Sequence, residues 1–88
     1  MSHDRPTPYA ELADVIASLP LLLREARRAR GLSLRATAKE LRISFSTVDR
    51  IERGEDCALS NAVAVLRWLD QTRTDAAEHQ ARLAEETS

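Results

Sequence analysis

Two short segments that favour helix, residues 34–41 and 45–53, are separated by only three residues. Ser33 and Ser44 stand directly before them, and serine is among the best residues for capping the N-terminus of a helix. Small or branched apolar residues recur on one side of each segment, and Gly54 ends the second. Two helices joined by so short a connection must turn sharply and bury their apolar sides in one shared core.

Three further helices are predicted around this pair. Apolar residues at helical spacing predict a helix over 9–18, and Pro20 opens another helix that Gly31 ends. A stripe of leucine and valine predicts the last one over 59–69. The chain has only 2 glycines and 3 prolines, too few for a fold built from many turns. We therefore expect an all-α fold, a compact five-helix bundle.

The length of 88 residues predicts a single domain with one small core. Residues 9–69 hold the predicted helices and form that domain. Residues 1–8 contain two prolines among polar residues, so we expect this N-terminus to be flexible. Residues 70–88 are polar and acidic, with Leu83 as their one large apolar residue, and are predicted to form a tail that is partly helical or disordered.

Charge is segregated along the chain although the total is only -1. Residues 20–54 carry nine basic and four acidic side chains, a net charge of +5. Residues 1–19 and 55–88 carry net charges of −2 and −4. A basic centre between acidic flanks can form a face that attracts phosphate. The alternative is that these charged side chains only contact water on the outer faces of helices.

Several classes of function are disfavoured by what the sequence lacks. Cys57 is the only cysteine and the two histidines, His3 and His79, lie near opposite ends, so we expect no disulfide within the chain, no metal site and no cofactor. No catalytic motif is present, and an enzyme is not expected. The longest apolar run, residues 19–23, is too short to span a membrane, and no signal peptide precedes it. We therefore expect a cytoplasmic protein with no membrane partner.

A set of residues at fixed spacing carries a family resemblance. The matching positions are Arg27, Gly31-Leu32-Ser33, Ala38, Ile43-Ser44, Ser46-Thr47-Val48 and Ile51-Glu52-Arg53-Gly54. In this pattern the chain closely resembles the phage repressor/Cro-like helix-turn-helix family, over about residues 20–69. The resemblance implies a lambda-repressor-like bundle with an extra N-terminal helix and a polar C-terminal tail. It also implies that the helix Phe45–Arg53 enters the major groove of DNA.

The resemblance further implies a buried ion pair between Arg27 and Glu52. The chain departs from the family pattern at three positions. Arg42 stands in the turn where the family usually has glycine in a left-handed conformation, at a cost of about 1 kcal/mol or more. Leu34 stands where the family often has a phosphate-binding glutamine, and Thr37 replaces a common leucine, which predicts a slightly wetter core.

The resemblance and the outward positions of the second motif helix together name candidate DNA contacts. The residues expected to contact base edges are Phe45, Ser46, Thr47, Asp49 and Arg50. Arg50 is expected to donate hydrogen bonds to guanine. Phosphates are expected to meet Ser33, Arg35, Arg42, Ser44 and Arg53. Two alternatives stay open: Phe45 packs on a thymine methyl or makes a core or dimer contact, and Asp49 binds cytosine or holds Arg50 or Arg53 in place.

The predicted function is a sequence-specific, double-stranded DNA-binding transcription regulator of the small Cro or repressor type, associated with the nucleoid. We expect a homodimer on a palindromic operator, formed through the 9–18 helix or through the 59–69 helix with Trp68. Trp68 is either an exposed anchor or a core aromatic, and Cys57 is either an apolar plug or a redox switch. The alternative is a protein-interaction module on the same fold, such as an antitoxin or an adaptor that uses the acidic flanks.

Overall fold

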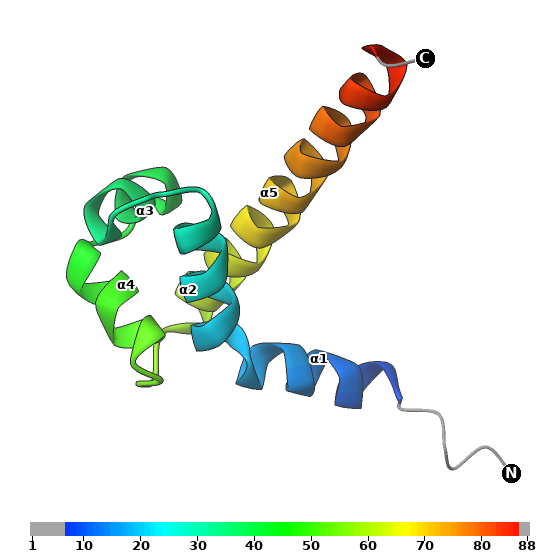
Figure 1. Ribbon diagram of the computed structural model, residues 1–88. Coiled ribbons are helices and arrows are strands. Elements are labelled where there is room, and N and C mark those ends of the chain that lie inside the picture. The colour runs from blue at the N-terminus through cyan, green and yellow to red at the C-terminus, as the bar shows by residue number, and fades with distance from the viewer. Residues whose placement is uncertain (1–6, 87–88) are drawn as a thin grey trace, which may run out of the picture.

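The computed structural model describes residues 7–86, and within this range all regular structure is helical (Figure 1). The helices are α1 (Pro8–Ala17), α2 (Leu19–Ala29), α3 (Leu34–Leu41), α4 (Phe45–Glu52) and α5 (Leu59–Glu86). The all-α prediction is confirmed, and α3 and α4 form the short pair expected from the sequence. The N-terminus is predicted to be flexible over residues 1–8, and residues 1–6 of this segment lie outside the described range.

Capping side chains precede α1, α3 and α4, and glycines in a left-handed conformation follow α2 and α4. The hydroxyl of Ser33 accepts from the amide of Ala36 at 3.0 Å, and Thr7 caps α1 in the same way. Gly31 follows α2 with a φ of 67°, a left-handed conformation that glycine adopts without steric cost. The second motif helix is predicted to include Arg53, whereas α4 ends at Glu52 and Arg53 is its capping residue.

One apolar core joins α2, α3, α4 and the first part of α5. Its buried members are Leu19, Leu23, Ala38, Leu41, Val48, Ile51, Ala62, Val65 and Trp68. Thr37 is also fully buried, and its hydroxyl donates to the carbonyl oxygen of Ser33 at 2.9 Å. This bond satisfies the hydroxyl within its own helix, so the threonine needs no water in the core.

A buried ion pair fixes α2 to the end of α4. Arg27 donates to the Glu52 carboxylate from Nε at 2.7 Å and from Nη2 at 3.0 Å, and from Nη1 to the carbonyl of Leu32 at 3.1 Å. The Glu52 side chain is 5% exposed. Hydrogen bonding to Glu52 raises the pKa of Arg27 above its ordinary value. Arg24 adds a hydrogen bond of 3.0 Å to the Glu52 carbonyl, so two arginines of α2 hold this helix end.

Trp68 is a core residue, which decides between the two interpretations of its role. Its indole N–H donates to Oε1 of Glu40 at 2.9 Å. Arg30 also binds this carboxylate, with Nη1 2.7 Å from Oε1, and its guanidinium carbon lies 5.6 Å from the centre of the indole ring. The Arg30 guanidinium and the indole N–H hold the pKa of Glu40 below its ordinary value. This cluster joins α2, α3 and α5 at one end of the bundle.

Two helical segments extend beyond the bundle (Figure 1). None of the residues of α1 is buried, although the helix carries several large apolar side chains. The last helix continues without a break from Leu59 through the polar segment 70–86. The radius of gyration is 15.6 Å, whereas a compact chain of this length has about 12 Å. The projecting helices account for this difference.

The ion pair predicts a large effect of Arg27→Ala on stability. The substitution leaves Glu52 as an unpaired buried carboxylate, which should lower the free energy of unfolding by about 3–5 kcal/mol. Arg28→Ala is the matched control, because Arg28 is exposed on the same helix. Urea unfolding of both variants tests this prediction. An unfolding midpoint of Arg27→Ala equal to that of Arg28→Ala would show that the pair has no structural role.

The Glu40 cluster predicts a pH dependence of stability. Because the pKa of Glu40 is lower in the folded chain than its ordinary value of 4.5, ionised Glu40 stabilises the fold above that pH. The contribution is lost as the pH falls through the lowered pKa of the folded chain. The difference in unfolding free energy between wild type and Glu40→Gln should therefore be constant at neutral pH and shrink below about pH 4.5. A difference that stays constant down to pH 3 contradicts this account.

Candidate nucleic-acid interface

The connection between α3 and α4 sets the angle at which α4 leaves the bundle. Arg42 lies in the left-handed region at φ 60° and ψ 38°, the conformation that the family resemblance implied for this turn. The amide of Ile43 then donates to the carbonyl of Ala38 at 3.1 Å, which closes the end of α3. Val48 of α4 is completely buried against the core. The opposite side of α4 therefore faces outward.

Hydrogen bonds centred on Ser44 join the hydroxyl groups at the start of α4. The Ser44 hydroxyl accepts from the amide of Thr47 at 3.2 Å and lies 2.7 Å from the hydroxyl of Thr47. The hydroxyl of Ser46 lies 3.3 Å from the same Ser44 oxygen. Ser44 and Ser46 are exposed and Thr47 is half-buried. The small polar side chains predicted to meet DNA thus form one ordered group at the N-terminus of this helix.

Phe45 is the first residue of α4 and lies outside the core, with 43% of its surface exposed. The guanidinium carbon of Arg35, on α3, lies 4.5 Å from the centre of its ring. This distance is that of a cation–π contact. The interpretation of Phe45 as a core residue is therefore wrong. The stack was not predicted from the sequence, because ten residues separate the partners on two different helices.

Two arginines of the α4 region differ in their surroundings. Arg53 lies 3.1 Å from the carboxylate of Asp49 and 3.2 Å from that of Glu55. Of the alternatives left open for Asp49, the structure thus pairs it with Arg53. Arg50 is exposed, and its side chain has no ion pair or hydrogen bond within residues 7–86. Its guanidinium is free to bind an external acceptor, whereas the charge of Arg53 is offset by its neighbours.

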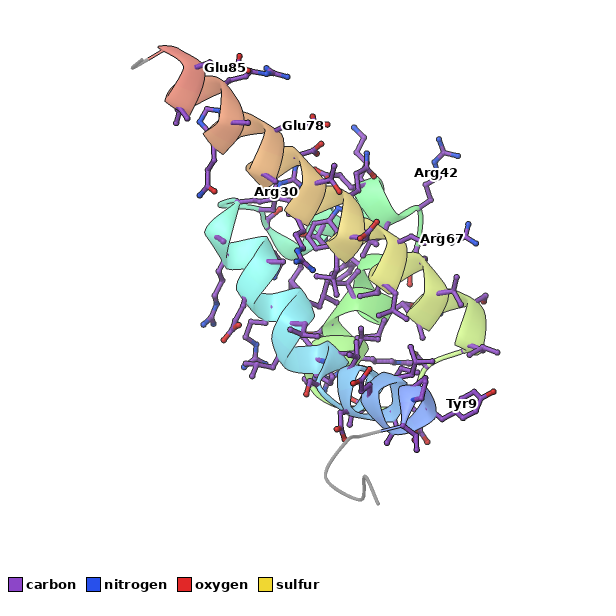
Figure 2. All side chains as sticks on the ribbon, turned by 90° about the vertical axis from the view of Figure 1, so that its right-hand side faces the viewer. Tyr9, Arg30, Arg42, Arg67, Glu78 and Glu85 are labelled. Carbon is purple, nitrogen blue, oxygen red and sulfur yellow. The ribbon has the colours of Figure 1, made fainter. Side chains whose placement is uncertain are left out.

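The remaining predicted phosphate contacts lie on the rim of this surface. Ser33 is exposed at the N-terminus of α3, where free backbone amides can bind an anion. Arg42 is exposed at the turn and has no ion pair among the described side chains. Arg67 of α5 projects from the same side of the molecule as Arg42 (Figure 2). Arg67 is exposed and is not among the predicted contacts, because the sequence left open whether the neighbouring Trp68 is buried and so which side of this helix faces outward.

The described residues were also searched for a metal site and for a membrane-spanning helix. Between residues 7 and 86 no group of three or more histidine, cysteine, aspartate or glutamate side chains is arranged to hold a metal ion. No helix in this range is long and apolar enough to cross a membrane. Cys57 is half-buried and packs against the core, which fits its interpretation as an apolar plug.

Comparison with known families decides what this arrangement of helices is. The family described as the helix-turn-helix domain matches residues 19–82. The chain belongs to the helix-turn-helix domain family. The match begins at the first residue of α2 and extends into the distal part of α5, so it includes the α3–α4 pair and leaves α1 outside. Membership supports DNA as the partner of this domain. No curated protein and no solved structure matches the chain.

The left-handed Arg42 predicts a stabilising substitution. A side chain in this conformation costs roughly 1–2 kcal/mol, and glycine avoids the cost. We expect Arg42→Gly to raise the free energy of unfolding by about 1 kcal/mol, as measured by urea unfolding. Arg42→Ala is the matched control, because it removes the same guanidinium and keeps the unfavourable conformation. Equal stability of the two variants would show that the turn is not strained.

Proposed function

We propose that the chain is a sequence-specific, double-stranded DNA-binding transcription regulator of the small Cro or repressor type. In this proposal α4 of the helix-turn-helix domain lies in the major groove. The observation that carries it is the outward face of α4, where Arg50 is exposed beside an ordered group of hydroxyls and its side chain is unpaired among residues 7–86. The groove is wide enough for a helix, and its base edges present the acceptors that a free guanidinium binds.

The roles of individual side chains follow from their surroundings. Arg50 donates to O6 and N7 of a guanine, which match its two parallel N–H groups. Ser46 and Thr47 hold positions in the first turn of α4, where helices of this kind contact base edges. Asp49 acts through Arg53, since the two side chains are 3.1 Å apart, and binding of cytosine by Asp49 would require this ion pair to open.

Phosphate binding uses the rim of the same surface. The N-termini of α3 and α4, capped by Ser33 and Ser44, each offer backbone amides to a phosphate group. Arg42 and Arg67 add positive charge on one side. Arg53 binds a phosphate only in competition with Asp49 and Glu55, so we expect it to contribute less than Arg42.

Selection of bound sequences from a random DNA pool, followed by titration, tests the proposed function. Arg50→Ala should weaken binding to the selected duplex by about 1–3 kcal/mol and relax the preference at one base pair. Arg82→Ala is the matched control, because it removes the same charge from the distal part of α5, far from α4 (Figure 1). Equal affinity and equal base preference of the two variants would refute the role of Arg50. Failure to select any sequence would refute the function.

A homodimer completes the proposal, because one helix-turn-helix unit reads only a few base pairs. The apolar side chains of α1 remain exposed, Leu12 at 55% and Ile16 at 46%. Val15 of the same helix lines a groove between α1, α2 and α5, and the charged residues Glu25, Asp70 and Arg73 also line it. The groove is lined in part by Val15, Leu22, Ala26, Ala29, Leu66 and Leu69. We propose that a second copy covers this surface and so brings two recognition helices to a palindromic operator.

Light scattering after size-exclusion chromatography tests the dimer. Wild type should have the mass of two chains, and Leu12→Glu should have the mass of one, because the substitution places a charge in the apolar contact. Gln80→Glu adds the same group to an exposed site on α5 and should remain dimeric. A monomeric wild type that purifies with a different protein would instead favour the interaction-module function, with α1 as its binding surface.

A further inference from the structure

The stack of Arg35 on Phe45 joins the two motif helices at the edge of the proposed DNA interface. Phe45 begins α4, Arg35 is exposed on the first turn of α3, and the guanidinium carbon is 4.5 Å from the ring centre. Neither side chain has a role in the core. Phe45 has 43% of its surface in water, and burying this apolar surface against a partner would be favourable. The exposed ring is therefore a candidate binding surface.

The geometry leaves both partners able to meet DNA. A guanidinium that lies over a ring keeps its N–H groups directed outward from its own edge, where they can still donate to a phosphate. Only one face of the ring can be covered by Arg35. Because Phe45 is in the first turn of α4, its remaining exposed surface points into the groove if α4 binds there.

The chemistry of the ring restricts what it can recognise. A phenyl group has no donor or acceptor, so it cannot distinguish bases by hydrogen bonds. The apolar feature that base pairs present in the major groove is the C5-methyl group of thymine. The same position carries a methyl group in 5-methylcytosine, whereas cytosine and uracil carry hydrogen there.

The backbone at Phe45 and one face of its ring are both held in place. The Ser44 hydroxyl caps α4 directly before it at 3.2 Å from the Thr47 amide, and the Arg35 guanidinium covers one face. A side chain whose position is fixed before binding loses little conformational entropy when it makes a contact. Arg35 is in this view a positioning residue for Phe45, and Phe45 is the residue that determines specificity.

We propose that Phe45, positioned by Arg35, reads the C5-methyl group of a pyrimidine in the operator, so that DNA binding depends on that methyl group. This inference rests on the proposed function and deepens it. It has a regulatory consequence. A methylated cytosine at the contacted position makes the contact with Phe45, and an unmethylated cytosine does not.

Substitution of deoxyuridine for thymidine tests the proposal, because it removes the methyl group and keeps every hydrogen bond of the base pair. Each thymidine of a selected duplex is replaced in turn, and the Kd is measured by titration. One position in each half-site should weaken wild-type binding about fourfold, the contribution of one buried methyl group. Phe45→Ala should bind the thymidine and deoxyuridine duplexes equally. Replacement of the same pair by cytosine and by 5-methylcytosine should reproduce the preference for the methylated base.

A second variant separates positioning from charge. Arg35→Lys keeps the positive charge but loses the planar group that stacks, so the ratio of the two Kd values should fall while the salt dependence of binding stays the same. Arg28→Lys, exposed on α2, should retain the full ratio. Thermal unfolding shows whether each variant is folded, and the side chains of Phe45 and Arg35 are exposed enough for substitution.

The possible failures are distinct. If no duplex is selected from the random pool, the regulator function fails and this inference fails with it. If duplexes are selected but no thymidine position distinguishes wild type from Phe45→Ala, only the methyl contact is refuted. If the ratio of the deoxyuridine Kd to the thymidine Kd is unchanged in Arg35→Lys, only the positioning role of Arg35 is refuted.

Discussion

The carboxylate of Glu52 is the group on which the rest of the structure depends. It lies at the end of α4, almost completely buried, and accepts two hydrogen bonds from Arg27 of α2. Arg24 binds the backbone carbonyl of the same residue. A buried carboxylate is costly unless it is fully paired, so only one placement of α4 against α2 satisfies it. The position of the proposed recognition helix is therefore set by a charge pair as well as by apolar packing.

The other end of α4 is fixed by different means. The Ser44 hydroxyl is hydrogen-bonded to the hydroxyls of Ser46 and Thr47, and Arg35 of α3 covers one face of Phe45. Between these two ends, Val48 packs into the core and Arg50 faces outward without a partner among the described residues. Because the helix is held at both ends, its position and the start of its outward face are fixed before any ligand arrives. Such preorganisation reduces the entropy lost on binding, which favours a surface built for recognition.

Local features of the fold were predictable from the sequence, and contacts between helices were predictable only in part. The serine caps and glycine stops depend on a few adjacent residues, so the bounds of α3 and α4 agree with the pattern to within one residue. The stack of Arg35 on Phe45 depends on how α3 and α4 are rotated against each other, which spacing alone does not determine. The ion pair of Asp49 with Arg53 has the i,i+4 spacing of helix neighbours and was therefore accessible from the sequence. The continuation of α5 through residues 70–86 does not follow from the sequence, because this segment has almost no large apolar side chain to reveal a helical period.

An NMR titration of the ¹⁵N-labelled chain with a selected duplex shows directly whether the outward face of α4 meets DNA while α2 holds this helix in place. If α4 meets DNA in this way, the amides of Ser33 and residues 44–50 should show the largest chemical-shift changes, and the buried residues of α2 and α5 should show small ones. Shifts confined to α1 or to the distal part of α5, with α4 unaffected, would contradict this binding mode.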